Sequence, residues 1–287
     1  MKKFYILTFL SLILASCHEK AKVQTVKEEM VTTTADDLKL IGSWVGSFNA
    51  DVKTEDYIPN IKINLIIKNI EGDSVSAQSV LAGNSRVISG KIIRTGQIAK
   101  FELFEPGNDK YDGKFTFEIA NGTLKGFWEA FDKTIKVNRR VFTLTKKAFV
   151  YNADLMLPEN DYYDEYNSKI EKVIDTIDGK EEKYDQAQYR YADEIVYKVN
   201  SSTHAFTEDE LKNLKKLELE ILRNTIYARH GLSFKKKGFR QFFDYVDWYI
   251  PVSGNVDDQL TSLERANIKL LSRFEQYATD SYDTFGR

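Results

Sequence analysis

The chain has 287 residues, a formal net charge of −2, 42% hydrophobic residues and one cysteine. A charge this close to zero gives no electrostatic basis for binding a polyanion, so we expect no nucleic-acid partner. One cysteine excludes an intramolecular disulfide, three histidines are too few for a histidine-rich zinc site, and no phosphate-binding loop occurs. We therefore expect neither a metal nor a cofactor.

Residues 1–16 have the pattern of a secretory signal peptide. Two lysines precede an apolar run, Phe4 to Leu14, that is shorter than the roughly 20 residues of a membrane-spanning helix. The run ends in Leu14-Ala15-Ser16-Cys17, which resembles a bacterial lipobox. This resemblance implies cleavage before Cys17 and lipidation of that residue. We therefore expect a lipid-anchored protein of the bacterial cell envelope, on the periplasmic side of a membrane or at the cell surface.

Residues 17–37 contain the expected lipidated cysteine and a polar stretch without hydrophobic periodicity. Such a segment predicts a flexible tether, and a coil of this length spans roughly 25 Å on average. The tether would lift a folded domain off the lipid headgroups.

Residues 38–147 alternate between apolar and polar side chains, as half-buried β-strands do. Turn sequences rich in glycine, asparagine and aspartate separate the apolar runs at hairpin spacing. The pattern predicts eight strands, near 41–49, 61–70, 73–81, 86–94, 98–105, 113–120, 123–131 and 135–146. Eight sequentially paired strands are enough to close an up-and-down antiparallel barrel.

The first strand carries Gly42-Ser43-Trp44, which resembles the Gly-x-Trp that opens the lipocalins. The resemblance implies a lipocalin-like or calycin-like barrel, with Trp44 in a structural role. It also implies that Arg139 or Arg140, on the last strand, packs over this tryptophan. Two interiors remain open: a cavity for a small molecule, or a barrel filled by its own side chains.

Residues 148–206 are acidic and hold eight of the sixteen tyrosines. Residues 174–180 have the pattern of a strand and a turn, and residues 189–199 that of another strand, so part of this connecting segment is predicted to form a hairpin. Its tyrosines suit either a surface packed against both neighbouring domains or a face that binds a protein or a basic ligand.

Residues 207–287 predict a small helical domain, which makes the whole chain an α+β protein. Capping boxes at Thr207–Glu210 and Thr261–Glu264 begin two helices. Between them, residues 214–231 form a longer helical pattern whose apolar arc spans roughly 200°, which indicates a central helix covered from more than one side. Glu218 and Arg229 fall within this arc, so each needs a partner; we interpret Glu218 as structural.

The central helix ends in Tyr227-Ala228-Arg229-His230-Gly231, where Gly231 is suited to the left-handed conformation that closes a helix. This string resembles the YARHG domain, a bacterial extracytoplasmic domain. The resemblance extends from Thr207 to about Tyr277 and implies no catalytic role. The same resemblance includes these flanking residues: Arg223, Asn224, Phe234, Phe242, Phe243, Trp248, Tyr249 and Pro251.

Two functions remain open. The first is a non-enzymatic envelope lipoprotein that binds an envelope protein or a glycan, with Arg229, His230, Lys235, Lys236 and Lys237 as candidate binding residues. The alternative is an envelope hydrolase or transferase with a site near Arg229 and His230. Ser233 and Lys236 have the spacing of an acyl-transferase dyad, but its companion motifs are missing, so we assign no catalytic residue.

Overall fold

The structure, a computed structural model, describes residues 35–51, 61–160, 162–177 and 180–280. The expected signal peptide, Cys17 and most of the expected tether lie outside these ranges. Within them, no helix is both long and apolar enough to cross a membrane.

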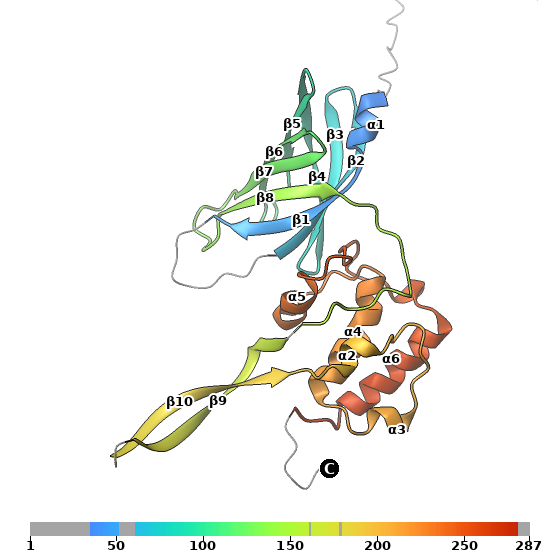
Figure 1. Cartoon of the computed structure of the whole chain (residues 1–287). Coiled ribbons are helices and arrows are strands. Elements are labelled where there is room, and N and C mark those ends of the chain that lie inside the picture. Colours follow the sequence, from blue (N-terminus) through green and yellow to red (C-terminus); the bar gives the residue numbers. More distant parts are fainter. Residues whose placement is uncertain (1–34, 52–60, 161, 178–179, 281–287) are drawn as a thin grey trace, which may run out of the picture. The chain divides into compact units, whose positions relative to one another are not determined.

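Eight antiparallel strands form a closed barrel in which each strand pairs with its neighbours in the sequence, and β1 also pairs with β8 (Figure 1). This confirms the predicted barrel. The strands are β1 (Gly42–Ala50), β2 (Ile61–Glu71), β3 (Ser74–Leu81), β4 (Asn84–Thr95), β5 (Ile98–Phe104), β6 (Gly113–Ala120), β7 (Thr123–Ala130) and β8 (Arg139–Lys146).

The last strand begins four residues later than the sequence pattern predicts. The side chain of Asp132 accepts hydrogen bonds from the backbone N–H of Thr134, at 2.8 Å, and from its hydroxyl, at 2.6 Å. An aspartate that bonds the chain two residues on stabilises a turn instead of a strand. Residues 131–138 therefore form a loop at one end of the barrel.

A short helix, α1 (Ala35–Leu40), precedes the barrel, so the flexible tether does not extend to residue 37 as predicted (Figure 1). The carbonyl of Leu40 accepts a hydrogen bond from the indole of Trp44, at 2.9 Å. Asp37 is buried and lies 2.7 Å from the guanidinium of Arg94 on β4. These contacts fix α1 to the barrel.

The predicted arginine over Trp44 is wrong. Strand register places Trp44 opposite Lys146, and the Lys146 ammonium lies 5.8 Å from the centre of the tryptophan ring. Arg140 pairs with Ala50 at the far end of β1, where it lies over Phe48, and Arg139 lies over Phe127. Trp44 is nevertheless buried in the barrel core, as its structural role requires.

The connecting segment contains the predicted hairpin, made of β9 (Tyr163–Ile177) and β10 (Lys180–Tyr191). The expected strand at 189–199 is wrong beyond Tyr191, because α2 (Ile195–Lys198) follows and buries Val196 and Tyr197 against the helical core. Several apolar and aromatic side chains of the hairpin are exposed, including Ile170 at 71% and Ile174 at 59%. The hairpin therefore does not pack along its length against both domains.

The helical part is built around α4 (Lys216–Arg229), which packs against α6 (Ser262–Glu275), α2 and α5 (Lys237–Phe243). Ten of its fourteen residues are buried, which confirms the prediction of a central helix. Both predicted capping boxes are present, one at α3 (Glu208–Leu211) and one at α6. Buried Glu218 accepts hydrogen bonds from the backbone N–H of Lys215, at 2.8 Å, and of Asp193, at 3.1 Å.

Polar contacts connect the barrel to the helical part. The backbone N–H of Lys62 donates to Asp244 at 3.0 Å, and the buried amide of Asn64 donates to the carbonyl of Pro251 at 3.0 Å. The hydroxyl of Ser233 accepts from the backbone N–H of Gly83 at 2.8 Å. Ser233 is only 3% exposed, so its hydroxyl has a structural partner and no access to a substrate.

Candidate functional site

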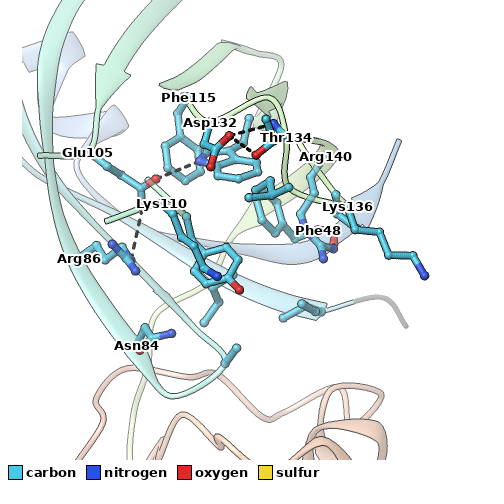
Figure 2. A pocket seen from close by; sticks show the side chains of 17 residues that line it. Phe48, Asn84, Arg86, Glu105, Lys110, Phe115, Asp132, Thr134, Lys136 and Arg140 are labelled. Carbon is cyan, nitrogen blue, oxygen red and sulfur yellow. Dashed lines mark hydrogen bonds and ion pairs between the residues drawn. The ribbon is translucent and has the colours of Figure 1, made fainter. Parts of the chain in front are cut away.

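A cavity of about 640 Å³ lies at one end of the barrel (Figure 2). Its lining comes from all the strands except β5 and from the loops that follow β3, β5 and β7. The rest of the barrel is filled by a continuous apolar core. The sequence left open a filled barrel or a barrel with a cavity. The structure combines the two, because most of the interior is filled by side chains and one end is hollow.

Aromatic side chains form the inner wall of this cavity. Phe48, Phe115 and Trp128 are each 6% exposed or less, although all three line the cavity. The ring of Phe48 lies edge-on to that of Trp128, with centroids 6.0 Å apart, and 6.2 Å from that of Phe115. This wall is suited to an apolar ligand body.

A charged network occupies one side of the cavity. Glu105 accepts hydrogen bonds from the indole of Trp128, at 2.9 Å, and from the backbone N–H of Gly113, at 2.7 Å. Its other oxygen lies 3.8 Å from Arg86, which also bonds fully buried Asp112. Burial raises the pKa of Glu105 despite these hydrogen bonds. Arg86 therefore has carboxylate partners already.

Arg140 lies beside Phe48 on the opposite side of the cavity from Arg86 (Figure 2). Its guanidinium donates to the carbonyl of Phe48 at 3.0 Å and lies 5.3 Å from the centre of the Phe48 ring. Burial, and then the neighbouring charge of Arg240, lower the pKa of Arg140 to about 10. The side chain remains a cation at neutral pH.

The rim of the cavity adds polar side chains from two loops. Lys110 and Tyr111 come from the loop after β5, and Asp132 and Lys136 from the loop after β7. Together with the wall, four basic and two acidic side chains line the cavity. Its lining is therefore net cationic.

The end of α4 is a closed structural unit. Gly231 has φ +76°, its N–H bonds the carbonyl of Ala228, and the N–H of Leu232 bonds that of Tyr227. These two bonds form a Schellman motif, which satisfies the last carbonyls of the helix. A Cβ at Gly231 would lie 2.5 Å from Val252 and 2.9 Å from the carbonyl of Ile250. The left-handed φ and the two hydrogen bonds let Gly231 close the helix as predicted, and the close contacts leave no room for a side chain there.

Arg229 is buried, at 2% exposure, and bonds neutral groups. It donates to the carbonyl of Leu155 at 2.8 Å and to the hydroxyls of Ser201, at 3.3 Å, and Ser202, at 3.1 Å. Burial lowers its pKa to about 10. The partners that the sequence pattern requires are thus supplied mainly by the segment before α4.

His230 is also 2% exposed, with its Nε2 2.8 Å from Glu264 and its ring stacked on Tyr151 at 4.2 Å. Tyr151 donates to the same carboxylate at 3.1 Å. The enzyme alternative requires a water-accessible histidine that faces two carboxylates. The structure has instead a packed histidine that contacts one carboxylate among the described residues.

The structure does not bring the five predicted binding residues to one surface. Lys235, Lys236 and Lys237 are exposed, whereas Arg229 and His230 are buried. Lys236 lies over the ring of Phe239, and Lys237 lies over that of Tyr166. Among the residues described, no cluster of histidine, cysteine and carboxylate side chains has the composition of a metal site.

Sequence reasoning did not find the cavity residues. Glu105 and Arg86 are charged residues in or beside strands, a position that usually faces solvent. Only the closure of eight strands brings them to the same wall as Phe115 and Trp128.

Comparison with known proteins identifies the C-terminal part alone. No curated protein and no solved structure matches the chain. The YARHG domain is typical of extracellular and periplasmic proteins, and its match here begins before α2 and ends just after α6. The chain carries a YARHG domain at residues 193–276, as the string that ends α4 predicted.

Proposed function

We propose that this protein is a non-enzymatic, lipid-anchored binding protein of the bacterial cell envelope, and that its barrel cavity holds a small ligand with an apolar body. The observation that carries the proposal is the hollow end of the barrel. Its volume of about 640 Å³ lies within the range of roughly 300–1,000 Å³ found for small-molecule sites. Such sites combine aromatic walls with a few placed polar groups, and this cavity has both.

The YARHG domain supports an extracytoplasmic location, and the lipobox resemblance at Cys17 supports attachment to a membrane. The domain itself is suited to interaction with an envelope protein or a glycan. The exposed hairpin β9–β10 and Lys235–Lys237 offer accessible surface for that partner. In this proposal the barrel binds the small ligand and the helical part binds the larger partner.

A neutral fluorescent probe, N-phenyl-1-naphthylamine, tests the barrel. Its emission should rise and saturate on titration with the protein, because the aromatic wall removes the probe from water. Leu81→Trp adds a large ring to the cavity lining and should weaken binding at least about tenfold, equivalent to roughly 1.4 kcal/mol. Val87→Trp, at an exposed position of β4, is the matched control and should bind like the wild type.

Circular dichroism of both variants must show an intact barrel. Equal binding by Leu81→Trp and Val87→Trp, or no saturable binding by the wild type, would refute a ligand site in the cavity.

A further inference from the structure

We propose that the cavity is specific for a ligand with one anionic group, a carboxylate or a phosphate monoester, on an apolar body, and that Arg140 is the receptor for that group. This inference rests on the proposed function, because it assumes that the cavity binds a small ligand. It adds the chemical class of the ligand and the residue that selects it.

The first observation is that Arg140 has no counter-ion among the described residues. In the part of the chain that the structure describes, no carboxylate lies within ion-pair distance of its guanidinium, and its contacts are the carbonyl and ring of Phe48. Other partly buried arginines do have carboxylate partners. The guanidinium groups of Arg86 and Arg190 each lie within 4 Å of three carboxylates. Among the described residues, Arg140 is thus a half-buried cation without a carboxylate partner.

The second observation concerns hydrogen-bonding capacity. A guanidinium has five N–H donors arranged in a planar fork that matches two oxygens of a carboxylate or phosphate. The carbonyl of Phe48 accepts one donor of Arg140, at 3.0 Å. An anion in the cavity would accept hydrogen bonds from the remaining N–H donors of Arg140. It would also offset the free-energy cost of keeping the charge of Arg140 away from bulk water.

A second guanidinium strengthens the local positive potential. Arg240 of α5 is close enough to lower the pKa of Arg140, and it also has no ion pair among the described side chains. Its guanidinium donates a hydrogen bond to the carbonyl of Lys235, at 2.5 Å. Two like charges repel each other, and an anion next to Arg140 relieves that repulsion.

The other side of the cavity limits the ligand to a single anionic group. Glu105 faces Arg140 across the cavity (Figure 2), and its carboxylate lies 3.8 Å from the guanidinium of Arg86. A ligand with anionic groups at both ends would place one of them near this carboxylate. The rings of Phe48, Phe115 and Trp128 line the space between Arg140 and Glu105 and suit an alkyl or aryl body instead.

Isothermal titration calorimetry with three matched probes tests the inference: decanoate, decyl phosphate and neutral decanol. The wild type should bind both anions at least about tenfold more tightly than decanol, because a hydrogen bond to a charged group contributes roughly 1.5–3 kcal/mol. The ratio of the two anion affinities separates a carboxylate ligand from a phosphate-bearing one.

Arg140→Gln should weaken both anions at least about tenfold and leave decanol unchanged. Arg139→Gln is the matched control, because Arg139, the neighbour of Arg140 on β8, lies over Phe127 and pairs with Asp51 and Glu129. This control should change no affinity by more than about twofold. Arg140→Lys, which keeps the charge and loses the fork, should retain part of the preference for anions.

If decanol binds as tightly as the anions, or if Arg140→Gln and Arg139→Gln behave alike, Arg140 is not an anion receptor, although the cavity remains a ligand site. If none of the three probes binds and the neutral fluorescent probe also fails, the proposed function is itself wrong. If Arg140→Gln does not fold, the partial preference expected of Arg140→Lys decides the question.

Discussion

Arg229 and Arg140 show two ways in which the same side chain can be removed from water. Arg229 is almost fully buried, and a carbonyl and two hydroxyls accept its hydrogen bonds. Arg140 is only half buried and uses one carbonyl, with its remaining surroundings open to a cavity. A fully satisfied guanidinium stabilises the fold, whereas a partly satisfied one beside a cavity is available to a ligand.

Arg229→Ala should therefore destabilise the helical part by about 3–5 kcal/mol, because it empties a buried site and leaves the carbonyl of Leu155 without its donor. Arg229→Lys should restore little of this loss, since an ammonium lacks the planar fork. Urea unfolding followed by circular dichroism measures both changes. Arg273→Ala, which removes an exposed arginine of α6, is the control and should cost no more than about 1 kcal/mol.

An unfolding curve of Arg229→Ala that overlays that of the wild type would contradict the structural role. In that case the end of α4 would become a candidate ligand site after all.

At the scale of elements, the packing of α4 on α6 buries a carboxylate with an incomplete partner. Arg223 Nε lies 3.0 Å from Glu275 Oε1, but the two atoms are not oriented for a hydrogen bond, and each is buried without a hydrogen-bond partner. Burial raises the pKa of Glu275 to about 7, although the charge of Arg223 opposes this shift. The contact between the two helices is consequently sensitive to pH near neutrality.

The folded pKa of Glu275 lies above its unfolded value near 4.5, so the folded state holds a proton that the unfolded state releases. The stabilisation from this group is complete below about pH 4.5 and is lost as the pH rises through about 7. The wild type should lose about 2 kcal/mol between pH 5 and pH 8 relative to Glu275→Gln, as measured by urea unfolding.

Glu208→Gln, which removes an exposed carboxylate, should follow the wild type within about 0.5 kcal/mol. A pH dependence that is the same in the wild type and in Glu275→Gln would show that Glu275 titrates normally.

The elements themselves were largely predictable, because each depends on local sequence. Alternating side chains predicted the eight strands, and the pairs Thr207–Glu210 and Thr261–Glu264 predicted two helix starts. The failure at residues 195–198 has a long-range cause: α2 replaces a strand there because Val196 and Tyr197 are buried against the helical core. No local pattern shows which distant surface will cover a segment.

At the scale of the whole molecule, the candidate site could not be predicted for the same reason. The cavity takes Phe48 from β1, Arg86 from β4, Glu105 after β5 and Arg140 from β8. The register of the closed barrel decides which of these side chains meet. The prediction of an arginine over Trp44 failed for this reason, because the strand register places Lys146 beside the tryptophan ring instead.

The proposed lipid anchor decides where the whole molecule acts. Two or three acyl chains at Cys17 would hold the protein at a membrane essentially permanently, since each buried methylene contributes about 0.8 kcal/mol. After a carbonate wash of bacterial membranes, wild-type protein should remain in the pellet, and Cys17→Ala should move to the supernatant. Ser11→Ala, which leaves the cysteine and the length of the apolar run intact, is the matched control and should stay in the pellet. Complete retention of Cys17→Ala would mean that another feature attaches the protein.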